Sequence, residues 1–475
     1  MTGNNAGVSL QGNKSASEVF YEVLSKAVQQ FDCWQDMQWP TQQGFKKHYV
    51  DLLPEFEARR LSSPQRFEIA RYLASEMQQN LNLGEETLEA ALAASTVQAV
   101  PLVEVVGQGI PAWQPTFSYL GKDWADFSQL GVALQNRRLI SPAAADSLTW
   151  LQTQQLTPGA LGLAERKVCV LGASAEMAAT EQFLRAGAKV LWLDRVAPPQ
   201  HLQEGQGYAG SLYYPEQNLD LLESPEAILA TMAAFADGEP MDLCLYAYAP
   251  GQAREVRLTG VMCGFVNTLP SNLIASVTML VSPTTPAALQ AEDLAQMAQR
   301  YENRPGWEGA LEKLGLLGRG GGCAKYADAA TIRSLVSIQG ASYQAAQYLG
   351  KLMMAEAWAN HGQLNSATPK PLRVSANTAA ITQTKSLDHP VFDAAFGGAA
   401  ALQVETFSPA QSQCLNGLLA ISDWLQEDMP VPGTVRIHGG IHTLPYPLEA
   451  ALKPAAGIGF MRAPVLLLGL LKGGR

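Results

Sequence analysis

The pattern of apolar and polar positions divides the chain into a helical first third and an alternating remainder. In the first third, apolar side chains recur three and four positions apart, which is the spacing of one face of an α-helix. Ser15 and Glu18 form a capping-box pattern that predicts the first helix start. The pairs Ser63-Pro64 and Ser141-Pro142 predict two more, because proline is favoured at a first helical position. We therefore expect a flexible tail at 1–14 and a mainly helical N-terminal domain at 15–160.

From residue 165 the pattern changes to short apolar runs separated by helical segments. The first two runs are RKVCVLGAS (166–174) and AKVLWLD (188–194), which are rich in β-branched residues and stop at a glycine or a polar residue. Strands that alternate with helices predict an α/β fold built on a doubly wound parallel sheet. Three later runs complete the expected strands: 241–249, 275–281 and 372–381.

This second domain is expected to span residues 165–430. It carries an insertion at 290–334, around the glycine-rich GRGGGC, which we interpret as a mobile loop or lid. A C-terminal extension, 431–475, follows. Its apolar run APVLLLGLL (463–471) is far shorter than the roughly 20 residues that a membrane-spanning helix needs. We expect no transmembrane segment; the run could contact a membrane surface weakly or pack against the substrate cleft.

Composition narrows the class of protein. The 475 residues are 47% hydrophobic and 16% charged, and the net charge of −10 leaves no basic field for a phosphate backbone, so we expect no nucleic-acid partner. Six cysteines lack both CxxC spacing and the density of a disulfide framework, which indicates a reducing compartment. The polar N-terminus does not resemble a signal peptide. We therefore expect a cytoplasmic globular protein.

The turn after the first expected strand is a candidate cofactor site. In a doubly wound sheet this turn faces the ligand crevice, and a helix N-terminus there can seat a pyrophosphate. About 20 residues later Asp194 ends the second strand, where a carboxylate accepts hydrogen bonds from a ribose diol. Arg195 could instead meet a 2′-phosphate, so NAD and NADP both stay open, as does a turn that binds nothing. The turn residues considered are Gly172, Ser174, Ala175, Glu176 and Met177; one glycine of the usual three is present.

The order of these segments resembles the short-chain dehydrogenase/reductase family over a little more than half the chain. VLGASAEMAATEQFLRAGAKVLWLDR is similar to the family's first strand, glycine turn, helix and second strand. LCLYAYAPG and EVRLTGVMCGF resemble the fourth strand with its turn, which contributes Ala249, and the next helix. SVTMLVSPTTP resembles the fifth strand, SYQAAQYLGK the tyrosine helix, and VSANTAAITQTKSL the sixth strand with a loop that contributes Thr382. The resemblance implies a Rossmann-like domain that binds NADP or NAD.

The resemblance also implies catalytic roles. In this family a tyrosine exchanges the substrate proton, a lysine four residues later lowers its pKa, and a serine polarises the carbonyl. The tyrosine falls on Tyr343 and the serine on Ser282, with Thr284 or Thr285 close enough to substitute. The lysine position is occupied by Gln347, and the position of the family's relay asparagine by Arg257.

The missing lysine leaves several interpretations open. Lys351 could supply the cation to Tyr343, or it could serve Tyr348, three residues before it on the helix surface. Enoyl thioester reductases, a related family, also separate the tyrosine and lysine by more than the usual interval. Arg257 could supply the cation, bind an acidic substrate, or be an ordinary exposed helix residue. The helix could also be simple core packing, since Tyr343, Ala346, Leu349 and Met353 recur at helical spacing.

Other motifs were given less weight. His438 and His442 have the i,i+4 spacing of metal-binding helices, but two glycines lie between them and no third ligand is evident, so we predict no metal. GRGGGC lacks the Gly-Lys-Ser/Thr ending of a phosphate loop, and Cys323 within it is interpreted as a bystander.

The sequence therefore favours an NAD(P)-dependent ketone or enoyl reductase. Its expected substrate is a hydrophobic small molecule or a carrier-linked acyl thioester, and a homo-oligomer would be in keeping with the family. The alternatives are a degenerate reductase-like protein that serves as a binding or scaffold partner, and a non-redox lyase or isomerase on the same fold.

Overall fold

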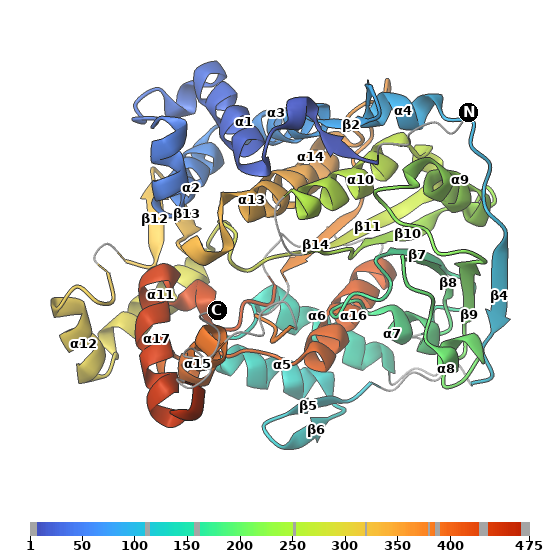
Figure 1. Cartoon of the computed structure of the whole chain (residues 1–475). Helices are drawn as coiled ribbons and strands as arrows, with labels where there is room; N and C mark the ends of the chain where they lie inside the picture. The colour runs from blue at the N-terminus through green and yellow to red at the C-terminus, as the bar shows by residue number, and fades with distance from the viewer. Residues whose placement is uncertain are drawn as a thin grey trace.

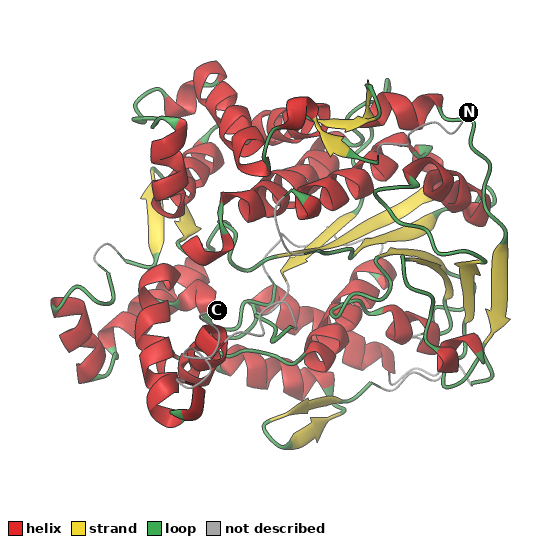
Figure 2. Ribbon diagram, in the orientation of Figure 1, coloured by secondary structure: helices red, strands yellow, loops and turns green. Residues whose placement is uncertain are grey.

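A seven-stranded sheet forms the centre of the computed structural model (Figures 1 and 2). The structure describes residues 7–109, 115–155, 162–249, 253–318, 321–378, 381–384, 390–426 and 436–466. The strand order is β14-β11-β10-β7-β8-β9-β4; the first six are parallel to one another, and β4 joins β9 antiparallel at one edge. The strands are β4 (Leu102–Val106), β7 (Lys167–Leu171), β8 (Lys189–Leu193), β9 (Ser211–Pro215), β10 (Met241–Leu245), β11 (Ile274–Val281) and β14 (Val374–Thr378).

The continuous apolar runs form strands because both faces of the sheet are buried. Along β7, Val168 and Val170 belong to one hydrophobic core, while Cys169 and Leu171 belong to a second core on the opposite face. This alternation follows from the two-residue period of a strand, and burial on both sides is typical of parallel strands. The predicted α/β fold is confirmed, and each expected strand run contains a strand.

One helical layer covers the face of the sheet drawn uppermost in Figure 1. Next to the sheet lie α10 and a continuous helical run, residues 341–361, whose middle is a π-helix, η5. The N-terminal helices pack on these in turn. The layer consists of α1 (Ala16–Gln30), α2 (Gln42–Ser62), α3 (Arg66–Gln79), α4 (Leu88–Ala94), α9 (Pro225–Ala236), α10 (Arg254–Thr268), α13 (Ala341–Gln344), η5 (Ala345–Met353) and α14 (Met354–His361).

A second layer covers the opposite face (Figure 1). Its core includes Phe183 and Trp424, whose ring centroids are 4.7 Å apart. The helices of this layer are α5 (Phe127–Asn136), α6 (Pro142–Gln155), α7 (Thr180–Arg185), α8 (Gln200–Gln203) and α16 (Pro409–Leu425). Short strands accompany the two layers: β1 (Ser9–Leu10), β2 (Leu81–Leu83), β3 (Glu86–Thr87), β5 (Phe117–Tyr119) and β6 (Lys122–Trp124).

The segment 15–160 does not pack as one unit. Helices α1 to α4 lie on one side of the sheet, β4 extends its edge, and α5 and α6 lie on the other side. The apolar side chains of α1 share a core with those of β10 and β11, so this part of the chain completes the sheet domain. The described part of the expected tail, 7–14, is also fixed, because Val8 is buried and β1 pairs with β2.

The expected lid, 290–334, is built of regular elements in its described residues. Two helices, a short loop and a hairpin occupy it, and the hairpin packs against α2. The C-terminal extension contributes α17, which packs closely on α15 beside the insertion. These elements are α11 (Ala291–Glu302), α12 (Gly306–Lys313), β12 (Cys323–Tyr326), β13 (Ala329–Ile332), α15 (Pro390–Ala399) and α17 (Leu448–Arg462).

Among the described helices, none combines the length and the apolarity needed to cross a bilayer. The apolar C-terminal run is described only as far as Leu466.

Candidate functional site

Three hydroxyl groups meet where β11 ends, at the carboxyl ends of the parallel strands. Ser282 directly follows the strand, and its Oγ lies 2.7 Å from Thr284 Oγ1. The Tyr343 side chain reaches the same point from α13, and contacts from Ser282 and Thr284 act to lower the pKa of its phenol. The structure thus brings together the tyrosine, serine and threonine that the sequence singles out.

Glutamine side chains hold this group in place. The Thr284 hydroxyl donates to Gln339 Oε1 at 2.7 Å, and Gln344 Nε2 donates to the Thr284 carbonyl at 3.0 Å. The Ser282 backbone N–H donates to Gln347 Oε1 at 2.9 Å. These contacts fix the backbone on either side of Ser282 and leave its hydroxyl directed at its neighbours.

Gln347 connects the hydroxyl group to a buried carboxyl. Its Nε2 donates to Glu255 Oε1 at 2.5 Å, and Glu255 lies in the first turn of α10 with 4% of its surface exposed. Burial raises the pKa of Glu255 to about 7, while Lys351 and Gln347 act to lower it. Lys351 is also buried; burial lowers the pKa of its amine, and Glu255 opposes this effect.

The charge of Glu255 acts on Tyr343. Its pKa is raised mainly by burial and next by the negative charge of Glu255, so the phenol stays protonated at neutral pH. Because the phenol keeps its proton, it can donate that proton to an oxygen held beside the two hydroxyls, which is the role of a general acid.

An apolar cavity of about 90 Å³ borders this group. Thr284 and Gln339 lie in its wall, and most of the remaining wall is aliphatic or aromatic. Its apolar side chains come largely from α15 and α17 and include Phe396, Leu448 and Ala451. The hydroxyl of Thr284 therefore stands at the boundary between the polar group and an apolar space.

Two of the expected residues lie apart from this site. The Tyr348 hydroxyl donates to Glu57 Oε2 at 2.5 Å, among the N-terminal helices. Arg257 Nη1 donates to the Val8 carbonyl at 3.0 Å, so it holds down the N-terminal segment.

The turn after β7, the expected cofactor turn, has the predicted glycine at its start, but the helix expected directly after it begins late. Gly172 has a φ of +83°, and a side chain there would strike Ala247, so this glycine is required. Asp194 stands at the end of β8, and its Oδ2 accepts from the Ser174 N–H at 2.9 Å and from the Ser174 hydroxyl at 2.8 Å. The following helix, α7, begins only at Thr180.

The remaining turn residues contact α16. Gln413 Nε2 donates to the Glu176 carbonyl at 2.8 Å, and Asn416 Nδ2 donates to the Met177 carbonyl at 3.4 Å. Ala175 closes the turn through its N–H, which donates to the Gly172 carbonyl.

The outer members of the expected cofactor site are spread along the same sheet edge. Arg195 is exposed beside Asp194, and Ala249 follows β10 half-buried. Thr382 is buried, and its Oγ1 lies 2.6 Å from Ser412 Oγ on α16.

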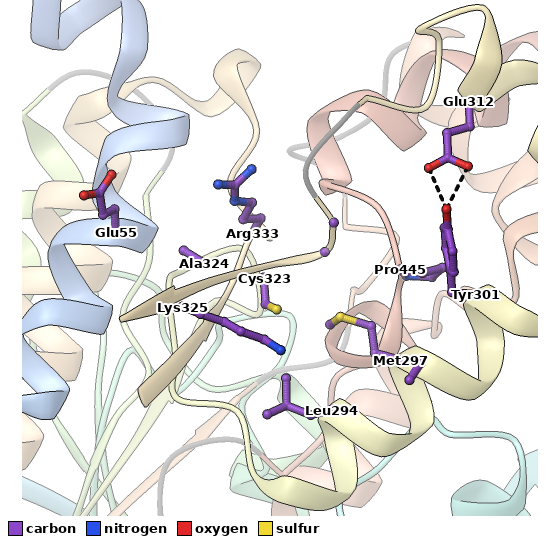
Figure 3. Close-up of a pocket in the computed structure, with 13 residues that line it drawn as sticks. Glu55, Leu294, Met297, Tyr301, Glu312, Cys323, Ala324, Lys325, Arg333 and Pro445 are labelled. Carbon is purple, nitrogen blue, oxygen red and sulfur yellow. Dashed lines mark hydrogen bonds between the residues drawn. The ribbon is translucent and has the colours of Figure 1, made fainter. Parts of the chain in front are cut away.

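A larger cavity of about 700 Å³ lies in the insertion, between α2, α11 and the β12–β13 hairpin (Figure 3). Cys323 and Lys325 line it from the hairpin, and Tyr301 lines it from α11 with its hydroxyl 3.2 Å from both Glu312 oxygens. Burial raises the pKa of the Cys323 thiol, although Lys325 and Arg333 oppose this, so the thiol is kept neutral.

The two histidines set aside from the sequence lie in the core, with ring centroids 5.1 Å apart. Burial lowers the pKa of His442 to about 3, so it is neutral. Within the described ranges, no group of three or more His, Cys, Asp or Glu side chains is arranged to hold a metal ion.

The sequence reasoning missed Glu255. The signal was present, because Glu255, Thr259 and Cys263 recur every four residues on the apolar face of α10, and all three are buried. A carboxyl on the buried face of a helix is unusual and is a sign of a functional or paired group.

Comparison with known proteins supplies no name for the site. No protein-family model matches the chain, and no curated protein matches it. The arrangement must therefore be interpreted from its own chemistry.

Proposed function

We propose that this chain is an NAD(P)-dependent oxidoreductase that reduces a carbonyl or enoyl group on an apolar substrate. The observation that carries the proposal is the group of Ser282, Thr284 and Tyr343 hydroxyls at the border of an apolar cavity. Such a border would hold an apolar chain on one side and place a polarised oxygen on the other.

The order of the sheet supports a doubly wound, Rossmann-like fold. Its six parallel strands follow the order third, second, first, fourth, fifth, sixth in the chain, which is the order of dinucleotide-binding sheets. Ligands of such sheets bind in the crevice outside the carboxyl ends of the strands. Gly172, Asp194 and Ser282 all follow strands at that edge.

The residues present fit the ribose end of the coenzyme better than its phosphate end. Asp194 stands where a ribose diol is bound, and exposed Arg195 is beside it. At the turn, Glu176 adds a negative charge, and α7 is short and begins late, so the N-terminus of a helix contributes little to a pyrophosphate site. We therefore expect weak nucleotide binding, in the high micromolar range.

The side chains of the site divide the work between them. A bound reduced nicotinamide would supply the hydride. The Ser282 hydroxyl turns from Thr284 to donate to the substrate oxygen and polarise it, while Thr284, whose proton goes to Gln339, holds Ser282 in place. Tyr343 then gives that oxygen its proton. The cavity walls from α15 and α17 hold the apolar part of the substrate and exclude water.

Calorimetric titration with NADPH and with NADH tests this proposal. We expect saturable binding of one nucleotide, weakened at least tenfold by Asp194→Ala and unchanged by Asp36→Ala, a matched loss of an exposed carboxylate far from the turn. Oxidation of the bound nucleotide is then followed by absorbance with methyl ketones from butanone to decanone and with crotonyl thioesters.

Three results would decide between the alternatives. Nucleotide oxidation that depends on an apolar ketone or enoyl thioester supports the reductase. Binding without oxidation by any of these substrates would replace it with a non-redox lyase or isomerase. If well-folded protein binds neither nucleotide, the oxidoreductase proposal is wrong, and a reductase-like binding protein takes its place.

A further inference from the structure

We propose that Glu255 is a positioning residue whose charge controls proton donation by Tyr343. The inference rests on the proposed reductase function and deepens it, because it assigns a control group that contacts Gln347, the residue at the position that the resemblance gives to the family's lysine. It is carried by the hydrogen bonds and the packing that hold Glu255 behind the hydroxyl group.

Glu255 is tied to the reacting group by a chain of two hydrogen bonds. The Ser282 N–H donates to the Gln347 side-chain oxygen, and the nitrogen of the same amide donates to Glu255. Gln347 has 2% of its surface exposed, so the chain is shielded from water. The carboxyl is thereby fixed relative to the hydroxyls of Ser282 and Tyr343.

Gln347 and Lys351 both face Glu255 because residues four positions apart lie on the same side of a helix. Both belong to η5, a π-helix, a form with i→i+5 hydrogen bonds that occurs frequently at functional sites. Here η5 is pressed against α10: a side chain at Gly350 would come within 2.6 Å of Thr259, and the Cys263 thiol donates to the Gly350 carbonyl at 3.2 Å. This close packing leaves Lys351 buried on the side of Glu255.

The groups that face Glu255 are few. Lys351 approaches it from η5 and Tyr343 from α13. Tyr248, after β10, acts on Tyr343, and Cys263 on α10 acts on Lys351. The other neighbours of α10 make contact further along it: Gln78 of α3 at the Gly260 carbonyl, and Glu89 of α4 at Asn267.

The chemical step shows why the charge matters. The substrate carbon accepts a hydride with its two electrons, the O–H bond of Tyr343 breaks, and a new O–H bond forms on the substrate oxygen. Tyr343 is left as a phenolate and regains its proton from solvent after the step. An ionised Glu255 repels this phenolate, whereas a protonated Glu255 does not, so proton donation is fastest when Glu255 is neutral.

Glu255→Gln tests the inference because an amide keeps the acceptor for Gln347 and removes the charge. For the wild-type chain we expect kcat/KM for NADPH-dependent ketone reduction to fall about tenfold as the pH rises through about 7. In the variant, kcat/KM should stay at the value that the wild-type chain has at acidic pH as the pH rises through about 7. Glu89→Gln, a carboxylate at the far end of α10, should keep the wild-type profile.

A titration that needs no coenzyme provides an independent readout. The ultraviolet absorbance of phenolate, corrected with Tyr343→Phe, reports the ionisation of Tyr343. We expect its midpoint to lie lower in Glu255→Gln than in the wild-type chain, because the amide carries no negative charge to oppose the phenolate. If Glu255→Gln folds poorly, Lys351→Met serves instead: losing a cation that lowers the pKa of Glu255 should move the fall in kcat/KM to higher pH.

The inference is overturned if Glu255→Gln binds NADPH normally and keeps both the wild-type pH profile and the wild-type Tyr343 midpoint. Failure of the proposed function looks different: the wild-type chain itself would bind or oxidise no nucleotide at any pH. In that case a shifted Tyr343 midpoint would still support the link between Glu255 and Tyr343.

Discussion

Two groups of polar side chains lie along one helical run, residues 341–361, which contributes the tyrosine of each. The groups contain the same kinds of side chain and differ in how completely the charges are paired. Each contains a tyrosine, a glutamate and a cation. In the first, Arg60 contacts both Glu57 oxygens at 2.7 Å, and Tyr348 donates to the same carboxylate at 2.5 Å. Arg60 also contacts Glu356 at 2.7 Å. All three partners are satisfied by direct contact, as a buried ion pair requires.

In the second group, by contrast, the charges are not in direct contact. Glu255 accepts from the neutral amide of Gln347, and the described residues include no ion pair within 4.0 Å between Glu255 and Lys351. Burial acts to raise the pKa of both glutamates, but only Glu57 has a guanidinium against it. We infer that the first group fixes the N-terminal helices to the sheet domain and that the second is available for chemistry.

The sharpest way to break this comparison is to remove each tyrosine hydroxyl. Tyr343→Phe should lower kcat by about 10²–10⁴, the range for loss of a general acid, because the Tyr343 phenol is the group that interacts with Ser282 and Thr284. Tyr348→Phe should leave kcat within about threefold and instead lower the unfolding free energy by about 1.5–3 kcal/mol, through a lost bond to a carboxylate. Steady-state kinetics and urea unfolding of both variants measure this. Equal effects of the two substitutions on kcat would contradict the assignment.

The cation of the first group offers a second test, with an expected effect nearly as large as that of Tyr343→Phe. Arg60→Met leaves Glu57 buried without its partner, so we expect a loss of about 3–5 kcal/mol in unfolding free energy. Arg185→Met removes the exposed partner of Glu181 and should cost less than about 1 kcal/mol. A small effect of Arg60→Met in urea unfolding would show that the first group is not structural.

The sequence predicted more of the sheet than of the helical layers. The strand runs stood out because burial on both faces leaves nearly continuous apolar runs, as in β10, where Asp242 is the one charged residue. Helix α2 was missed, since Pro54 lies inside it and the charged residues Glu57 and Arg60 are buried with its apolar side chains. The Ser63-Pro64 signal marked the end of α2, and α3 begins at Arg66. The start of α1 at its capping box was predicted correctly.

For the site, residue types were predictable and their pairing was not. Ser282 and Tyr343 are found together because each follows a strand or begins a helix at the same sheet edge. The π-helix changes the angular spacing after Ala345, so α-helical arithmetic could not place Lys351. Arg257 was expected at the site but contacts Val8, whereas Glu255, two residues earlier, contacts Gln347.

A third prediction uses the pH dependence of stability. The pKa of Glu255 is about 7 in the folded chain and 4.5 as a free group, so the folded state binds more protons between these values. The contribution of Glu255 to the free energy of unfolding is therefore fully present below about pH 4.5 and is lost as the pH rises through about 7. Glu255→Gln should remove this fall and be more stable than the wild-type chain at alkaline pH by about 1–3 kcal/mol. Urea unfolding of both proteins at mildly acidic and alkaline pH measures the difference, and a constant gap would contradict it.

The smallest expected effect is the change in stability on Lys351→Met, and its sign distinguishes the second group from the first. Lys351 is buried, and burial lowers the pKa of its amine, although Glu255 and then Cys263 oppose this. Lys351→Met removes a poorly solvated amine and keeps the packing of a long side chain, so stability at neutral pH should be unchanged or higher by about 1 kcal/mol. The same cation-to-methionine change at Arg60 is expected to destabilise strongly. Thermal unfolding of the two variants side by side measures the contrast. A large loss at Lys351 would mean that both groups hold the fold together, and the distinction between a structural and a chemical group would disappear.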